Sequence, residues 1–325
     1  MQWRSGTIVG LVMALLAIPA AVSAQQSDGF PRWLETFRAR ALSEGISPAV
    51  VDDALGDVAL DDSVVVLDQK QPETKITFSK YISNTISPRR IRIGRAMLQE
   101  HHAVLQKISR RYGVQPKYIV ALWAIESDYG NNKGGFSVVQ SLATLAYEGR
   151  RAAFFGDELI AALKILEAEN LRADELTGSW AGAMGDCQFM PSTYLRYAVD
   201  GNGDGKRDIW NEPADVFASV AHYLNALGWN KKEGWGRAVS VPEGITIEQA
   251  DLKQPHPASY WRARGFTYEG GAAVPDTQAT RYAMLPGTAE EGAYLVTDNF
   301  QALLQWNRSR YFATSVGMLA DAIGE

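Results

Sequence analysis

This 325-residue chain has a single cysteine and lacks both a second long apolar run and an excess of basic charge. Its one cysteine, Cys187, cannot form an internal disulfide and cannot build a zinc site alone. The 32 Lys and Arg residues are outnumbered by 37 Asp and Glu, and no basic stripe stands out, which argues against nucleic acid as the main partner. What remains, 46% hydrophobic and 21% charged residues, is typical of a globular protein with a full core.

The single long apolar run lies near the N-terminus. It extends from Ile8 to Val22, follows Arg4, and ends in the small-x-small sequence Val22-Ser23-Ala24. A run of this length is too short to span a bilayer and is typical of a secretory signal peptide, here residues 1–24. No cysteine lies near the cleavage site, so we expect an exported protein with neither a lipid anchor nor a transmembrane segment in the mature chain.

Helical spacing of apolar residues dominates the rest of the sequence, which predicts a mainly α (α+β) fold. We expect a helical body over residues 25–234, including one long helix from Pro88 to Tyr112 and an extended segment from Val64 to Thr77. Residues 235–298 are richer in Gly, Pro and short β-branched runs, and predict a loop-rich, β-containing insertion. A helical pattern returns over residues 299–325 and is expected to rejoin the body.

A buried helix with a carboxylate at its end is the first candidate for chemistry. Residues Ile119–Ile125 carry no charge, and Glu126 closes the run before Ser127-Asp128-Tyr129-Gly130 breaks the helix. Burial and the negative end of the helix dipole both raise the pKa of such a carboxyl, which suits an acid that must hold a proton near neutral pH. The alternative is an ordinary helix-terminal Glu that points into solvent or pairs with a Lys or Arg.

A second candidate is the segment Gly178–Ser192, which is dense in Gly and Ala. Small residues let a backbone pack closely against a ligand or another segment. Gln188 followed by Phe189 resembles a polar group held by an apolar wedge, as in a ligand pocket. The alternative is a tight crossover loop with no ligand.

A third candidate is the D-x-N-x-D-G spacing of a calcium loop. Its candidate ligands are Asp200, Asn202, Asp204 and Lys206. The twelfth loop position is Asn211, where a bidentate Glu is expected, so an ordinary EF-hand is incomplete. The alternative is an acidic turn stabilised by its own side chains, without metal.

Three segments together resemble the soluble-domain pattern of the membrane-bound lytic transglycosylase B family, lysozyme-like enzymes that cut peptidoglycan. They are Glu126-Ser127-x-Tyr129-Gly130, then Ala181-Gly182-Ala183-Met184-Gly185-x-x-Gln188-Phe189-Met190-Pro191-Ser192, then Trp306-Asn307-x-Ser309. The resemblance covers nearly the whole mature chain. One departure is Asp186-Cys187, which stands where such proteins typically carry Tyr-Gly or a similar uncharged pair and puts an acidic group close to the cleft.

The resemblance implies a lysozyme-like helical fold, a periplasmic location and a single catalytic acid/base, Glu126. The implied substrate contacts are Ser179, Gln188, Tyr223, Asn307 and Tyr129. Asp215, on the helix after the calcium-type loop of residues 200–215, matches the last calcium ligand of the family. Catalysis would need no cofactor, and calcium would be structural. The implied partners are peptidoglycan glycan strands, with other cell-wall enzymes as further partners.

The implied reaction cleaves the β-1,4 bond between N-acetylmuramic acid and N-acetylglucosamine with one carboxylate. Glu126 would protonate the glycosidic oxygen and then accept a proton from the C6 hydroxyl of the same muramic sugar, which attacks the anomeric carbon and leaves a 1,6-anhydro end. Ordinary glycosidases need two carboxylates, so one alternative is a hydrolytic muramidase in which Asp186 or Asp128 activates water. Another is a non-catalytic peptidoglycan-binding protein, although a binder has no need of a desolvated acid.

Overall fold

A computed structural model describes residues 29–69, 76–244, 252, 255–284 and 292–324. The expected signal peptide, residues 1–24, lies outside the described residues. Across the described ranges, no helix combines the length and the apolar character that a membrane span requires.

Helices build most of the molecule, and the sequence sets many of their ends. Ser47, Ser87 and Ser137 accept a backbone N–H of the helix that each precedes, and Gly113 ends a helix in the left-handed conformation. The helices of the body are α2 (Phe30–Ser43), α3 (Pro48–Leu55), α4 (Asp62–Gln69), α5 (Phe78–Thr85), α6 (Pro88–Glu100), α7 (His102–Tyr112), α8 (Pro116–Ser127), α9 (Val138–Glu148), α10 (Ala152–Glu169), the 3₁₀ turn η1 (Ala173–Glu175), α11 (Pro191–Tyr197), α12 (Pro213–Ala226), α14 (Asp298–Trp306) and α15 (Arg310–Gly324).

Helix α8 lies at the centre of this body. It packs against α6, α7, α12 and α15, and every side chain from Tyr118 to Ala124 is buried. The continuous apolar run therefore forms a helix buried on nearly all sides, as predicted. Because α15 lies at the end of the chain, residues 310–324 complete the core around α8, a helix that comes much earlier in the sequence.

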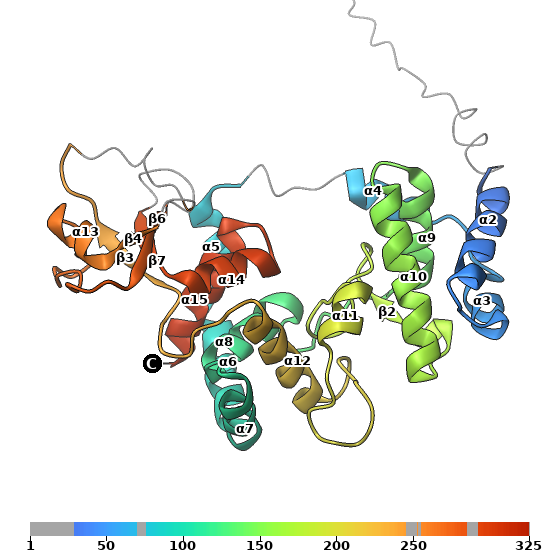
Figure 1. Cartoon of the computed structure of the whole chain (residues 1–325), viewed down its shortest axis with the longest axis horizontal. Helices are drawn as coiled ribbons and strands as arrows, with labels where there is room; N and C mark the ends of the chain where they lie inside the picture. Colours follow the sequence, from blue (N-terminus) through green and yellow to red (C-terminus); the bar gives the residue numbers. More distant parts are fainter. Residues whose placement is uncertain (1–28, 70–75, 245–251, 253–254, 285–291, 325) are drawn as a thin grey trace, which may run out of the picture.

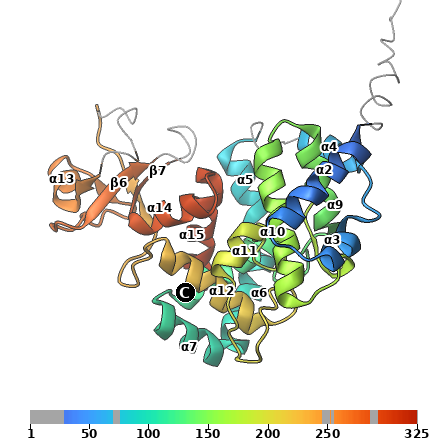
Figure 2. The ribbon, with the colours of Figure 1, turned by 45° about the vertical axis from the view of Figure 1, so that its right-hand side comes forward.

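A small antiparallel sheet lies at one end of the molecule, beyond α14 and α15 (Figures 1 and 2). Its strands run in the order β4-β6-β7-β3-β5, and with the helix α13 (Ala258–Ala263) they enclose a separate apolar cluster that includes Trp261 and Phe266. The strands are β3 (Gly236–Ser240), β4 (His256–Pro257), β5 (Thr267–Tyr268), β6 (Thr280–Met284) and β7 (Ala293–Val296). The predicted mainly α fold with a small sheet is confirmed, whereas the limits at residues 235, 298 and 299 stay predictions.

Two local expectations were wrong. The predicted helix from Pro88 to Tyr112 is interrupted at His101, whose ring packs edge-on against Trp123 and Phe217 at centroid distances of 5.9 and 5.1 Å. A tertiary contact of this kind is invisible in local periodicity. The segment predicted to be extended from Val64 begins instead inside α4, and residues 70–75 lie outside the described part.

Candidate active site

Glu126 lies on the last turn of α8, where Asp128 ends the helix in the left-handed conformation (φ 50°). From α14, Trp306 donates its indole N–H to Glu126, with Nε1 and Oε1 2.7 Å apart. Burial raises the pKa of Glu126 to about 7, and the Trp306 hydrogen bond opposes this rise. No Lys or Arg among the described residues pairs with Glu126, so the carboxyl is neither ion-paired nor fully solvated.

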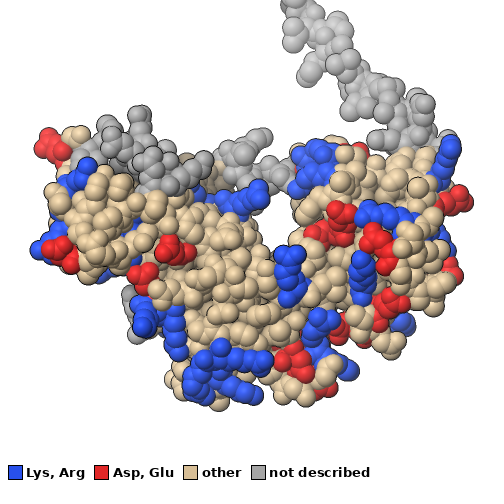
Figure 3. Space-filling view, viewed as in Figure 1, with Lys and Arg blue, Asp and Glu red and all other residues tan. Residues whose placement is uncertain are grey.

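Aromatic rings form a wall beside this carboxyl. Trp306 packs against Tyr223 of α12 and Phe189 of the loop before α11, at centroid distances of 4.9 and 5.4 Å. Tyr223 in turn stacks on Tyr197 of α11 at 4.3 Å. Figure 3 shows a deep hollow between the part of the molecule built by α9 and α10 and the part built by α14 and α15. The structure thus surrounds one protonatable group with apolar surface contributed by three distant segments.

Trp306 is a site residue that sequence reasoning missed. Its segment, Trp306-Asn307-x-Ser309, is one of the three that carry the family resemblance, but the resemblance implies a role for the adjacent polar residue Asn307 instead. Asn307 is exposed, and its Oδ1 accepts a hydrogen bond from the backbone N–H of Ser309 at 3.0 Å. The motif indicates that this segment belongs to the site. Only the three-dimensional contact with Glu126 identifies Trp306 as the side chain of the motif that reaches the acid.

The glycine-rich segment forms a tight loop that holds Ser179 and Gln188. A Cβ on Gly178, in the short strand β2 (Thr177–Gly178) that pairs with β1 (Phe136–Ser137), would lie 2.2 Å from the carbonyl oxygen of Ala183, so a side chain is excluded there. The Ser179 hydroxyl accepts a hydrogen bond from the Ala183 N–H at 3.0 Å.

Gln188 has a left-handed backbone (φ 48°) and a side-chain amide held by the protein. Its Nε2 donates to the carbonyl oxygens of Gly185 and Lys133 at 2.9 and 3.2 Å. Since both donors of the amide are used, its orientation is fixed, and its Oε1 is the atom left to meet a ligand. Phe189, the next residue, connects this loop to Trp306 and so to Glu126.

Asp186 turns inward, away from the solvent. It is only 6% exposed and accepts a hydrogen bond from Trp123 Nε1 at 2.8 Å, while Lys133 Nζ lies 3.4 Å from its other oxygen. Burial raises the pKa of Asp186, and both the Trp123 hydrogen bond and the Lys133 charge oppose this. A Cβ on Gly130 would meet Asp186 Oδ2 at 2.7 Å, so the Gly in the first motif leaves room for this carboxylate.

Asp128 is the other carboxylate close to Glu126 in sequence. It forms ion pairs with Arg89 at 3.1 Å and with Arg90 at 3.4 Å, both on α6. The pairs join the end of α8 to the start of α6 and satisfy the charge of Asp128. Neither Asp128 nor Asp186 is therefore a free base beside Glu126.

Tyr129 does not lie where a substrate contact was expected. It is 8% exposed, packs edge-on against Trp123 at 5.5 Å, and donates its hydroxyl proton to the carbonyl oxygen of Arg90 at 2.6 Å. The left-handed backbone at Asp128 and Tyr129 directs this ring into the core. We interpret Tyr129 as a structural residue that fixes the end of α8 against α6.

The calcium-type loop is a set of turns closed by its own carboxylates. Asp200 accepts backbone N–H groups of Gly203 and Gly205, and Asp204 accepts that of Lys206. Asp215, fully buried on α12, accepts two more backbone N–H groups, and burial raises its pKa. The donor set is rich in oxygen, as calcium requires, but no group of three His, Cys, Asp or Glu side chains in the described chain is arranged to hold a metal.

Comparisons with known proteins agree on one family. Residues 29–321 match the model described as transglycosylase SLT domain. Membrane-bound lytic murein transglycosylase B of Escherichia coli (strain K12) is 31% identical over 278 residues, which cover 81% of this chain and 74% of that protein.

Two solved structures extend this likeness. SltB3 from Pseudomonas aeruginosa in complex with NAG-anhNAM-pentapeptide is 41% identical with a TM-score of 0.87, over 91% of this chain and 79% of that chain. The Escherichia coli lytic transglycosylase Slt35 in complex with calcium is 28% identical with a TM-score of 0.76, over 90% of this chain and 92% of that chain.

Proposed function

The chain belongs to the transglycosylase SLT domain family and is a peptidoglycan lytic transglycosylase; from this premise we propose which residues carry the reaction. It cleaves the β-1,4 bond between N-acetylmuramic acid and N-acetylglucosamine and leaves 1,6-anhydromuramic ends. The relative SltB3 was solved with both NAG-NAM-pentapeptide and NAG-anhNAM-pentapeptide, a substrate-like and a product-like ligand. The observation that carries the assignment of roles is the carboxyl of Glu126, isolated from other charges and hydrogen-bonded by Trp306.

In the first step Glu126 acts as general acid. A pKa of about 7 keeps much of the carboxyl protonated at neutral pH, so it can deliver a proton to the oxygen that leaves with N-acetylglucosamine. The bond between that oxygen and the anomeric carbon of the muramic sugar breaks as the proton transfers. Trp306 donates to Oε1 and stabilises the carboxylate that remains, which leaves Oε2 to carry the proton.

In the second step the Glu126 carboxylate acts as base. It accepts the proton of the muramic C6 hydroxyl, and the C6 oxygen forms its bond to the anomeric carbon. Glu126 is thereby returned to its protonated form and no water is consumed. Because the nucleophile belongs to the substrate, it is present at high effective concentration, and the wall formed by Phe189, Tyr223 and Trp306 excludes competing water.

Substrate contacts are proposed for the polar groups that surround this wall. Gln188 offers Oε1 from a fixed amide, and Ser179 offers a hydroxyl on the same loop. Tyr223 is half-buried within the wall, and burial raises its pKa, so its hydroxyl stays protonated and can donate to the sugar or to Glu126. We also propose a substrate contact for Asn307, the exposed residue directly after Trp306.

The hydrolytic alternative requires a second carboxylate to activate water. Asp128 is paired with two arginines, and Asp186 is buried against Trp123, so both carboxylates are engaged elsewhere. A non-catalytic peptidoglycan-binding protein has no need of a buried carboxyl with a raised pKa such as that of Glu126.

Mass analysis of the muropeptides released from purified sacculi tests the proposal. The products should be lighter by one water than hydrolysed muropeptides, and mainly reducing muramic ends would overturn it.

We further propose that the loop of residues 200–215 binds a structural calcium ion through side-chain oxygens of Asp200, Asn202, Asp204 and Asp215 and through the backbone carbonyl oxygen of Lys206. The calcium complex of Slt35 and the oxygen-rich donor set support this.

Catalysis itself would need no cofactor. The apolar run from Ile8 to Val22, followed by Ser23 and Ala24, supports a periplasmic location. Other cell-wall enzymes are its proposed partners. We also propose the division into residues 25–234, 235–298 and 299–325.

A further inference from the structure

Gln188 adopts a conformation that its surroundings must maintain. A left-handed backbone (φ 48°) costs free energy for a residue with a side chain. Within its own loop, the backbone N–H and the side-chain Nε2 of Gln188 both donate to the Gly185 carbonyl oxygen, at 3.2 and 2.9 Å. The other partner of Nε2 is the carbonyl oxygen of Lys133 at 3.2 Å, which comes from a different segment. The direction of the free Oε1 therefore depends on where Lys133 lies.

Lys133 belongs to the short connection between α8 and β1. The connection begins tied to α8, because the N–H of Asn132 donates to the Ser127 carbonyl oxygen at 2.8 Å. It then packs directly on the glycine-rich loop, since a Cβ on Gly134 would lie 2.0 Å from the Gly178 carbonyl oxygen. Lys133 stands between these two contacts. It thus lies where the end of α8 meets the loop that carries Gln188.

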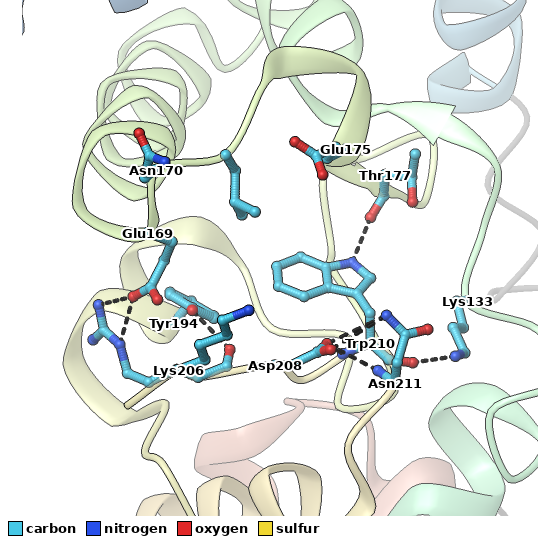
Figure 4. Close-up of a pocket in the computed structure, with 12 residues that line it drawn as sticks. Lys133, Glu169, Asn170, Glu175, Thr177, Tyr194, Lys206, Asp208, Trp210 and Asn211 are labelled. Carbon is cyan, nitrogen blue, oxygen red and sulfur yellow. Dashed lines mark hydrogen bonds and ion pairs between the residues drawn. The ribbon is translucent and has the colours of Figure 1, made fainter. Parts of the chain in front are cut away.

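The side chain of Lys133 anchors this connection to a third segment (Figure 4). Its ammonium group donates to the carbonyl oxygen of Trp210 and lies 3.4 Å from Asp186 Oδ1. Trp210 is itself held, because its indole Nε1 donates to the Thr177 carbonyl oxygen at 3.0 Å. The neighbouring Ile209 carbonyl oxygen accepts the Asp186 N–H at 2.8 Å. The Lys133 ammonium group is therefore bound to a segment that also holds the glycine-rich loop.

We propose that Lys133 is a positioning residue: its ammonium group, held by the Trp210 carbonyl oxygen, fixes the backbone carbonyl that orients the Gln188 amide toward the sugar. The inference rests on the proposed function, in which Gln188 contacts the glycan. The pKa of Glu126 is set by burial and by Trp306, without a contribution from Lys133. Loss of the Lys133 cation should therefore weaken substrate binding and leave the chemical step nearly unchanged.

The test is Lys133→Met in the full mature protein, with soluble glycan strands as substrate. Methionine keeps an unbranched apolar side chain and removes the cation. We expect KM to rise about fivefold, as for one hydrogen bond that is no longer held in place, and kcat to stay within about a factor of two. The fall of kcat/KM at alkaline pH should stay at its wild-type position, because Trp306 still bonds Glu126. A lower kcat with a moved pH profile would overturn the proposal.

Lys117→Met is the matched control. Lys117 also pairs with a carboxylate, that of Asp321 at 2.6 Å, and its side chain is 32% exposed against 30% for Lys133. It lies at the start of α8, whereas Glu126 lies at the end, so its loss should leave KM unchanged. Melting temperatures of both variants report any general loss of stability. A wild-type KM in Lys133→Met, even with a lower melting temperature, would show that Lys133 is only structural.

A second pair of variants tests whether Lys133 acts through Gln188. Gln188→Asn keeps a residue that tolerates a left-handed backbone but shortens the side chain by one methylene, so it should raise KM by itself. Adding Lys133→Met to Gln188→Asn should then change KM by less than about twofold, because the contact through which Lys133 acts is already lost. A further rise of about fivefold would overturn the proposal. Failure of the proposed function looks different, since the wild type itself would then release no anhydro product.

Discussion

The indole Nε1 of Trp306 lies 2.7 Å from Oε1 of Glu126, across a separation of 180 residues. This contact joins the end of α8 to the end of α14 and places a single polar donor on an otherwise isolated acid. Burial raises the pKa of Glu126, while the indole N–H favours its ionised form. The balance leaves a carboxyl that can give up a proton and take one back near neutral pH.

Glu126→Gln should abolish turnover while leaving binding to sacculi largely intact. The amide keeps the shape and hydrogen-bonding capacity of the carboxyl but cannot deliver or accept the proton. The measurement is the initial rate of muropeptide release beside a sacculus pull-down. Residual activity above about a tenth of wild type, equivalent to only ~1.4 kcal/mol of barrier, would mean that another group is the acid.

Trp306→Phe should keep the aromatic wall and lose the N–H that bonds Glu126. We expect kcat to fall about tenfold, since a donor to the developing carboxylate is removed. The pKa of Glu126 should rise, because the lost hydrogen bond had lowered it. The fall of kcat/KM at alkaline pH, where the free enzyme loses its acid proton, should then move to higher pH. An unchanged profile, or one moved to lower pH, contradicts the role given to Trp306.

Stability should show the cost of keeping Glu126 buried. Its pKa is about 7 in the folded protein against 4.5 as the ordinary value, so the folded state binds more protons and wild-type stability declines as pH rises between these values. Glu126→Gln does not titrate, and should be more stable than wild type at pH 8 by roughly 2 kcal/mol, after allowance for the partial exposure of the side chain. The difference should vanish near pH 4. Denaturant unfolding at both pH values measures this, and a pH-independent difference would show that desolvation of the carboxylate is not its cause.

Asp186→Asn should leave the product pattern unchanged. The buried carboxylate faces Trp123 and Lys133, and an Asn carbonyl oxygen can still accept the Trp123 N–H, so a small change in melting temperature is the main effect expected. Chromatography with mass detection of the muropeptides compares the two proteins. If wild type yields some hydrolysed ends that disappear in Asp186→Asn, then Asp186 activates water after all.

Calcium should stabilise the folded protein through the loop at residues 200–215. Asp204→Ala should lower the melting temperature in calcium but not in EGTA, because an ion bound only by the folded state stabilises it by mass action. If the wild type melts at the same temperature in both buffers, the loop binds no calcium and is a turn closed by its own carboxylates.

Much of this structure could be predicted from local sequence. The features that could not be predicted depend on three-dimensional contacts and on side-chain direction. The run Ile119–Ile125 determines a buried helix by itself, so the position and environment of Glu126 were predictable. The Trp306 contact was not, since nothing local says that residue 306 lies beside residue 126. Tyr129 stands in a recognisable motif, but a motif does not reveal the direction of a side chain, and a left-handed backbone turns this one into the core.

The central claim is that the muramic C6 hydroxyl, and not water, attacks the anomeric carbon. Digestion of purified sacculi in water enriched in ¹⁸O tests it directly, because a hydrolase must place one solvent oxygen on every new muramic end. The account predicts anhydro products without ¹⁸O, and the same absence of label in the products of Trp306→Phe. New muramic ends that carry ¹⁸O as the main product would contradict it and would make the protein a hydrolase with Glu126 as its acid.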